Sequence, residues 1–286
     1  MKILVTGASG NVGKAVVKSL LDLNEEVVAA SVDPDKSQSD FSQQIEIVMF
    51  DFTDSSTFDN ALNGIDRVFL MRPPHLGNPQ DLYPFIDALK EHNIKLVSFL
   101  SLMGVENNPI PPHHKIEKYI EKVGLPYAHV RPSFFMQNIS GVHAEEIRTM
   151  DQIYVPAGKS KTSFIDVSDI GLSVATLLHN PEKYVNTSHT ITGSQSLDYF
   201  QVAKILSQVT GRDITYPNIS FIKYRNHYIK NRKLDHKYVN VTVALYFMTR
   251  MGTAKMITNG FYELTGKQPK TFLQFALENK KIFKEF

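Results

Sequence analysis

The chain opens with MKILVTGASGNVG (residues 1–13), in which an apolar run ends at three glycines spaced three apart, Gly7, Gly10 and Gly13. An amphipathic helical pattern follows at once, so this stretch predicts a strand, a tight turn and a helix. Gly7 permits the sharp turn, Gly10 lets a pyrophosphate approach the backbone, and Gly13 lets the helix pack on the strand. The helix N-terminus offers free N–H groups to phosphates. The alternative is a glycine-rich turn in an ordinary α/β domain.

We therefore predict a dinucleotide-binding turn. Its residues are Gly7, Ala8, Ser9, Gly10, Asn11, Val12 and Gly13. The spacing G-x-x-G-x-x-G differs from the more common fingerprint G-x-G-x-x-G, and this narrows the class of protein.

Composition sets limits on the class of protein. The 286 residues are 42% hydrophobic and 21% charged, which suits a substantial core. A net charge of +2 does not favour nucleic acid as a direct partner. Without cysteine there is no disulfide and no thiol nucleophile. No apolar run is long enough to span a bilayer, and residue 1 leads directly into a strand, so we expect a cytoplasmic protein without membrane contact.

The first half of the chain alternates between strand and helix patterns. Near-continuous apolar runs predict strands at residues 3–5, 26–31, 45–50, 67–71, 96–101 and 127–131. Helical patterns lie between them at residues 55–62, 79–92 and 113–123. This alternation predicts an α/β fold, a Rossmann-type doubly wound parallel sheet, with the ligand outside the carboxyl ends of the strands.

The alternation loosens after about residue 140. We predict short strands at residues 162–165 and 189–192, and helices at residues 166–178, 196–209 and 271–281, with a weaker helical pattern over residues 218–249. The predicted domains are a dinucleotide-binding domain at residues 1–150, with strands also contributed from about 152–192, and a smaller, mostly helical substrate-covering lobe at residues 195–286.

An acidic residue is expected about 20 residues after the third glycine, and Asp33 occupies that position. A carboxylate there accepts hydrogen bonds from the adenosine ribose and repels a 2′-phosphate, which favours NAD. Lys36 follows in the same turn and would suit the 2′-phosphate of NADP, so both cofactors stay open. Asp33 could instead serve only to cap the turn before Pro34.

Two further loops follow predicted strands. Asp51 and Phe52 are placed to bond the adenine amine and to pack on its ring, although a helix cap is an equally ordinary role for this stretch. Met71 and Arg72 leave the fourth strand beside the expected cofactor path. Arg72 is predicted to contact phosphate or substrate, the alternative being a solvated loop arginine.

The ordered motifs of the whole chain resemble the NmrA-like group of atypical short-chain dehydrogenases/reductases. The motifs that carry the resemblance are TGASGNVG (6–13), Asp51-Phe52, FLSL (99–102), Glu117, GLPY (124–127), VRP (130–132), FMQN (135–138) and FIDVSDI (164–170). The resemblance implies an NAD(P)H-dependent reductase of a quinone-like or small aromatic acceptor. It is strongest with the quinone-reductase branch.

The resemblance also indicates where the chemistry departs from the wider superfamily. Ordinary members use a Tyr-x-x-x-Lys pair and a serine after the fifth strand. Ser101 occupies the serine neighbourhood, whereas alignment on Glu117 puts His113 at the lysine position and Pro109 at the tyrosine position. We therefore predict Ser101 and His113 as the catalytic residues. With an ordinary pKa near 6.5, His113 would also be a proton donor, and His114 is the alternative if the alignment slips by one.

Apolar side chains are candidates for the acceptor site. Met103, Phe134, Phe135 and Met136 follow the fifth and sixth strands and would suit a flat aromatic substrate, with a core role equally open for the last three. Adjacent histidines point in different directions on a helix, so we assign no metal ligand at residues 113 and 114.

Three functions are consistent with these patterns. The first is a hydride-transferring reductase with NAD or NADP as cofactor and a small-molecule acceptor as partner. The second is a non-catalytic dinucleotide redox sensor that acts through a protein partner. A nucleotide-sugar epimerase ranks last because it normally needs the missing tyrosine. The sequence leaves a homodimer open.

Overall fold

The computed structural model describes residues 1–41 and 45–284, which fold into two compact units. The first unit comprises residues 1–132, 167–191 and 259–267. It contains a seven-stranded, entirely parallel sheet in the order β3-β2-β1-β4-β5-β6-β7. The strands are β1 (Lys2–Val5), β2 (Glu26–Ser31), β3 (Glu46–Met49), β4 (Ile65–Leu70), β5 (Leu96–Leu100), β6 (Tyr127–Pro132) and β7 (Thr187–Ile191). The predicted doubly wound α/β fold is confirmed.

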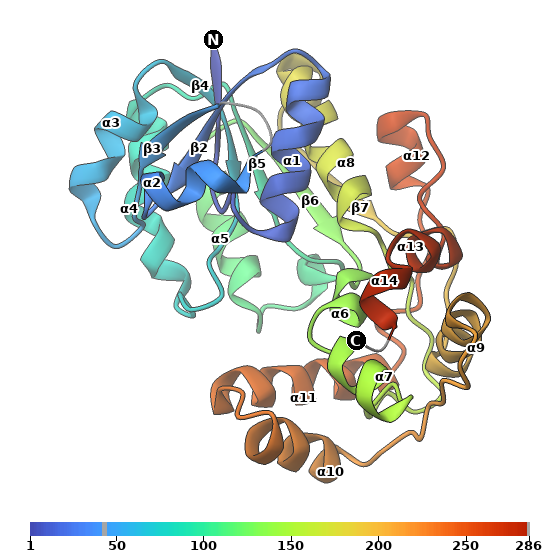
Figure 1. Cartoon of the computed structure of the whole chain (residues 1–286). Helices are drawn as coiled ribbons and strands as arrows, with labels where there is room; N and C mark the ends of the chain where they lie inside the picture. Colours follow the sequence, from blue (N-terminus) through green and yellow to red (C-terminus); the bar gives the residue numbers. More distant parts are fainter. Residues whose placement is uncertain (42–44, 285–286) are drawn as a thin grey trace. The chain divides into compact units, whose positions relative to one another are not determined.

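Helices cover both faces of this sheet, which explains why central strands such as β1 and β5 are buried along almost their whole length. The helices of the first unit are α1 (Asn11–Asp22), α2 (Pro34–Ser37), α3 (Phe58–Leu62), α4 (Tyr83–Glu91), α5 (Pro112–Lys122), α8 (Val167–His179) and α12 (Gly260–Thr265). Figure 1 shows α1 and α8 side by side on one face, and they pack directly on each other. On the other face, helices α3, α4 and α5 share a core with alternate strand residues such as Leu4, Val68 and Phe99.

Two glycines allow α1 to lie close to its neighbours. A Cβ atom on Gly13 would lie 2.1 Å from the Gly7 carbonyl oxygen, and one on Gly171 would lie 2.5 Å from the Ala15 carbonyl carbon. Gly13 thus joins α1 to the turn after β1, and Gly171 joins α8 to α1. Side chains at either position would force the backbones apart.

The second unit comprises residues 133–166, 192–258 and 268–286, and its described part is mostly helical. The helices are α6 (Gln137–Ser140), α7 (Ala144–Met150), α9 (Tyr199–Thr210), α10 (Phe221–Asn226), α11 (His236–Arg250), α13 (Phe272–Glu278) and α14 (Lys280–Phe283). They enclose an aromatic-rich core that includes Tyr199, Phe272 and Phe275.

A buried polar network runs through the second unit. Glu146, which is 1% exposed, accepts hydrogen bonds from Arg232 (2.6 Å), Tyr228 (3.1 Å) and His227 (2.8 Å). His143 lies between the hydroxyls of Tyr228 (2.8 Å) and Tyr246 (2.7 Å). Burial alone would raise the pKa of Glu146, but the bonds from His227 and Arg232 outweigh it and lower that pKa. The network therefore contains a buried carboxylate that is ionised at neutral pH.

Several predicted elements differ from the structure. The predicted strand at residues 162–165 is wrong: its residues are buried, but they form only isolated bridges, Thr162 with Leu197 and Ile165 with Phe135. The strand predicted at 189–192 is β7, which begins at Thr187. The weak helical pattern over 218–249 divides into α10, a π-helical turn at His227–Asn231 and α11. The apolar residues at 162–165 are buried in a core without joining the sheet, because long-range pairing decides which segments become strands.

The predicted division at residues 1–150 and 195–286 concerned which part binds cofactor and which covers substrate. Compactness alone does not show that, so the division stays a prediction.

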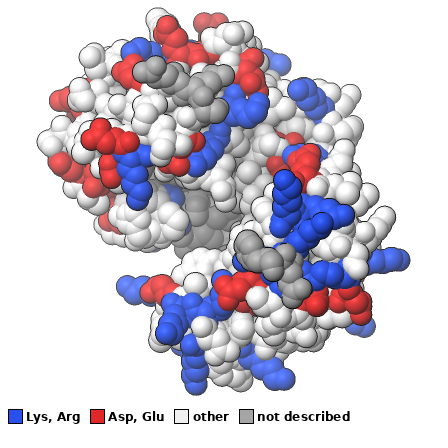
Figure 2. Space-filling view, in the orientation of Figure 1, with Lys and Arg blue, Asp and Glu red and all other residues white. Residues whose placement is uncertain are grey.

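Figure 2 shows acidic and basic side chains on the viewed face. Acidic residues outnumber basic ones in the first unit and the reverse holds in the second, so the small net charge conceals an uneven distribution. Within the described ranges, no helix combines the length and the apolar character needed to cross a membrane.

We predict that Gly171→Ala destabilises the first unit by about 2–4 kcal/mol, because the new methyl group meets the backbone of α1. Gly77→Ala is the matched control, since a Cβ there meets nothing within 4 Å. Urea unfolding of both variants measures the difference. Equal stability of the two variants would contradict the proposed backbone contact.

We predict that Arg232→Met costs about 3–5 kcal/mol, because it leaves the Glu146 carboxylate buried without its main cation. Because the pKa of Glu146 is lowered in the folded state, its stabilising effect is present above its ordinary pKa and lost as pH falls below it. Arg232→Met should weaken this acid dependence. Arg225→Met is the control, since Arg225 is exposed and bonds only Asn240 among the described residues. Unfolding curves at pH 7 and pH 4 test both expectations.

Candidate cofactor site and active site

The strand register brings the predicted loops to one edge of the sheet. Val5 pairs with Ala29 and with Phe69, so the turn after β1 lies between the segments that follow β2 and β4. Leu70 pairs with Phe99, which places Arg72 near the end of β5. The chain order reverses between β1 and β4, and ligands of open parallel sheets bind at such a switch point.

The glycine turn has the geometry that phosphate binding requires. Gly7 has a left-handed backbone with φ of +63°, and Gly7, Ser9 and Asn11 are exposed, whereas Ala8, Val12 and Gly13 are buried. Helix α1 has Gly10 at its N-cap, no side chain capping it and no acidic residue in its first turn. Its first N–H groups are therefore available to an anion.

Asp33 lies at the end of β2 and is exposed. Its carboxylate accepts a hydrogen bond of 3.2 Å from the Lys36 backbone N–H, so it caps the short helix α2. Lys36 is exposed, and Val32, the residue before Asp33, has an apolar side chain that is 66% exposed. The capping role is thus present, while the ribose contact of Asp33 stays a prediction. Sequence reasoning did not single out Val32, and its only distinguishing feature is an exposed apolar side chain directly after β2.

Asp51 and Phe52 follow β3. Asp51 accepts hydrogen bonds from the Thr53 backbone N–H (2.8 Å) and hydroxyl (2.7 Å), and these bonds lower its pKa. Phe52 is 9% exposed, with its ring edge-on to Phe50 and Phe85 at 4.7 and 5.4 Å. Both residues therefore have structural partners, and their contact with adenine stays a prediction.

Met71 and Arg72 flank the glycine turn on the β4 side. The Thr6 hydroxyl accepts a hydrogen bond of 2.9 Å from the Met71 N–H, and the Met71 methyl group fills the space that a Cβ on Gly7 would need. Arg72 is half-buried and donates to the carbonyls of Pro73 (3.0 Å) and Leu76 (2.6 Å). Its Nε is buried without a hydrogen-bond partner among the described residues, and burial lowers its pKa. Arg72 is therefore not a solvated loop arginine.

The predicted catalytic residues lie after β5 and at the start of α5. Ser101 is 5% exposed; its hydroxyl lies near Glu117 and lowers the pKa of that carboxyl, although no hydrogen bond of normal geometry joins them. His113 lies in the first turn of α5 with its ring 6.1 Å from that of Phe99. The Nδ1 atom of His114 is 2.8 Å from the Val105 carbonyl oxygen, which ties that ring to the backbone. The Nδ1 atom of His113, by contrast, has no such bond to any of the described residues.

His113 is neutral at physiological pH. Burial lowers its pKa to about 4, assisted by the positive charge of Arg72 and opposed by Glu117. The ordinary pKa near 6.5 expected for His113 is therefore wrong. Its Nδ1 is buried without a hydrogen-bond partner among the described residues. A neutral imidazole can donate one N–H bond to a ligand, but it is a poor source of a proton.

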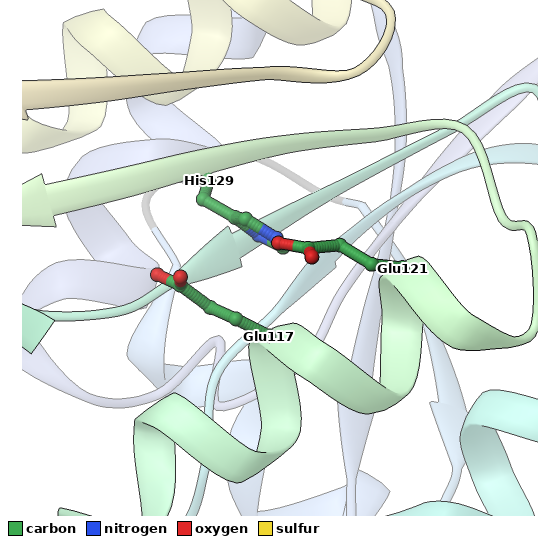
Figure 3. A group of neighbouring side chains, drawn as sticks. All are labelled: Glu117, Glu121 and His129. Carbon is green, nitrogen blue, oxygen red and sulfur yellow. The ribbon is translucent and has the colours of Figure 1, made fainter. Parts of the chain in front are cut away.

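Charged side chains join helix α5 to β6. Sequence reasoning used Glu117 only for the alignment and Arg131 only as part of the VRP motif, and it did not single out Glu121 or His129. Arg131 donates to both oxygens of Glu117, at 3.0 and 2.7 Å. Glu117, Glu121 and His129 approach one another between α5 and β6 (Figure 3), with one ligand atom from each within 4.8 Å of the others. The spacing of four between the two glutamates was the available signal.

The predicted acceptor-binding side chains fall into two groups. Met103 lies in the first unit and is partly exposed, with its N–H donating to the Pro132 carbonyl (3.0 Å). Phe134, Phe135 and Met136 belong to the second unit. Met136 is 1% exposed within the core, so its side chain has no surface for a substrate. Phe134 and Phe135 are partly buried, and their contact with an acceptor stays a prediction.

Comparison with known proteins agrees with this architecture. The model of the NmrA-like family matches residues 1–256. The chain belongs to this family. Prestalk A differentiation protein A of Dictyostelium discoideum is 32% identical over 97% of this chain and 92% of its own length. The NAD(P)H azoreductase of Xenophilus azovorans is 26% identical over 98% of this chain and 99% of its own.

A solved structure shares the fold of this NmrA-like protein. The NADPH-dependent quinone oxidoreductase QOR2 of Escherichia coli, complexed with NADPH, superposes with a TM-score of 0.87 at 20% identity, covering 98% of this chain and 99% of the other. At this identity the likeness supports the fold alone.

We predict that the glycines separate folding from cofactor binding. Gly10→Ala should keep the thermal stability of the free protein, because the nearest atom to its Cβ is the Gly7 oxygen at 3.4 Å, but weaken NADPH or NADH binding at least about tenfold by blocking the pyrophosphate. Gly13→Ala should instead destabilise the free protein by about 2–4 kcal/mol. Calorimetric titration and thermal unfolding measure the two effects. Unchanged binding by Gly10→Ala would show that phosphates do not approach this turn.

Proposed function

We propose that this protein is an NAD(P)H-dependent oxidoreductase that transfers hydride to a quinone-like or small aromatic acceptor. The observation that carries the proposal is the turn after β1, with its left-handed Gly7, its side-chain-free N-cap at Gly10 and its close contact at Gly13. Membership of the NmrA-like family, and relatives named as NAD(P)H reductases, support the same activity.

The residues at the sheet edge fit a nicotinamide dinucleotide. The exposed backbone at Gly7, Ser9 and Asn11 would hold the pyrophosphate at the α1 N-terminus. Asp33 or Lys36 would contact the adenosine ribose or its 2′-phosphate, and their common exposure keeps both NAD and NADP as candidates. When bound, the reduced nicotinamide would supply the hydride.

The chain's own residues favour an acceptor that needs no strong acid. Pro109 stands at the position of the superfamily tyrosine, and His113 is held neutral by burial and by Arg72. A neutral His113 and the Ser101 hydroxyl are able to orient an acceptor oxygen by hydrogen bonding. A quinone accepts hydride readily, and its oxyanion takes a proton from water, so positioning is the main requirement.

We predict that a panel of quinones, azo dyes and triphenylmethane dyes contains acceptors that speed NADPH or NADH oxidation. His113→Ala should lower kcat about 100-fold, because it removes a donor aimed at the developing oxyanion. His114→Ala is the control, since the His114 ring contacts the Val105 carbonyl. The proposal fails if no acceptor gives a rate above that of the His113→Ala variant.

The pH profile is a separate prediction. Because the pKa of His113 is about 4, its imidazole stays neutral across neutral pH, and kcat with a quinone should be flat between pH 6 and pH 8. A fall in kcat on raising the pH through about 6.5 would show instead that an imidazolium donates the proton.

A redox sensor is the second candidate function. It is favoured by the absent tyrosine and by the relative at 32% identity, which is named for cell differentiation rather than for a reaction. Tight dinucleotide binding without turnover of any acceptor, together with a stable protein partner in pull-downs, would select this function over the reductase.

A further inference from the structure

His129 is a buried imidazole whose nitrogens lack hydrogen-bond partners. The residue lies on β6 and is 0% exposed, and both Nδ1 and Nε2 are buried without a hydrogen-bond partner among the described residues. Leaving such nitrogens unsatisfied costs free energy, so native structures rarely do so. An imidazole in this position is short of a ligand on at least one nitrogen.

Two carboxylates from one face of α5 lie beside this ring. The Nε2 atom of His129 is 3.6 Å from Glu121 Oε1, too far for a hydrogen bond. Figure 3 shows the imidazole beside the Glu121 carboxylate, while the Glu117 carboxylate, one helical turn away, lies farther from the ring, with all three ligand atoms within 4.8 Å of one another. Two ligands of a tetrahedral zinc ion lie about 3.4 Å apart, so the His129–Glu121 spacing already fits, whereas Glu117, whose ligand atom is within 4.8 Å of the other two, has to move closer.

We propose that Glu117, Glu121 and His129 form a binding site for a divalent cation of the zinc class. The site is independent of the proposed hydride transfer. Imidazole with two carboxylates suits zinc and neighbouring first-row metals, whereas Mg²⁺ and Ca²⁺ prefer oxygen ligands alone. The fourth ligand would be water.

The surrounding charges allow a cation there. Glu106 is 3.4 Å from Arg131, and Lys118 is 2.8 Å from Glu121, so three carboxylates face two basic side chains before any metal enters. Arg131 uses one lone pair on each Glu117 oxygen and leaves a second one for a metal.

Such a site would fasten α5 to β6. Glu117 and Glu121 are one and two turns along α5 from His113, so a bound metal would immobilise the helix that carries His113. Metal binding to the folded state alone also stabilises it by mass action.

The test is calorimetric titration of chelator-treated full-length protein with Zn²⁺, with Co²⁺ absorption reporting the coordination geometry. We expect one equivalent of Zn²⁺ to bind, Mg²⁺ not to compete, and the visible bands of low-coordinate Co²⁺ to appear. Glu121→Gln and His129→Gln should each weaken Zn²⁺ binding at least about tenfold. His92→Gln is the matched control, since His92 pairs with Asp59 at 3.0 Å away from this site.

Two results would overturn the proposal. One is the absence of a Zn²⁺ site in the wild type. The other is a site whose affinity and Co²⁺ spectrum are the same in Glu121→Gln, which would place the metal elsewhere. Glu121 is 26% exposed in its side chain, so its variant is informative even if His129→Gln fails to fold. Imidazole ¹⁵N shifts of His129 on adding Zn²⁺ give an independent reading of the same contact.

Discussion

The close approach of α1 to its surroundings is the constraint on which the first unit depends. The helix touches the turn after β1 at Gly13 and touches α8 at Gly171, and neither contact has room for a Cβ atom. These contacts fix the N-terminus of α1 against the carboxyl end of β1. Packing behind the turn consequently holds its exposed N–H groups in place, and a ligand would not contact that packing.

Much of this arrangement could be predicted from residues alone. Continuous apolar runs identified the first six strands, and the three glycines identified the tight turn between β1 and α1, because both signals depend on local geometry. The strand predicted at 162–165 was wrong because its apolar residues serve a core instead of a sheet, and the beginning of β7 was missed because Thr187 and Ser188 are polar. Pairing between residues far apart in the chain decides such cases, and apolar patterning does not contain it.

The candidate site was predictable in position but not in protonation. Strand register brings Asp33, Met71, Arg72 and Ser101 to the same edge, as the alternation of elements requires. The low pKa of His113 comes from burial and from Arg72, which is 41 residues away in the chain. The network around Glu146 was missed for the same reason, since its members come from α7 and its N-cap, from the π-helical turn and Arg232 just after it, and from α11.

The four-residue spacing along helix α5 positions both the predicted catalytic histidine and the two glutamates that face β6. His113, Glu117 and Glu121 recur every fourth residue and so lie along one stripe of the helix, while Ile116 and Ile120 beside them are buried in the core. The stripe begins at the end of β5, where chemistry is expected, and continues along β6, where Arg131 and His129 meet the two glutamates. A change in the charge near Glu117 therefore shifts the pKa of His113 through Coulomb interaction. A change in the anchoring of α5 shifts the position of the His113 ring. The environment of His113 thus depends on Arg72, Phe99 and Glu117, which lie on three different elements or loops of the first unit.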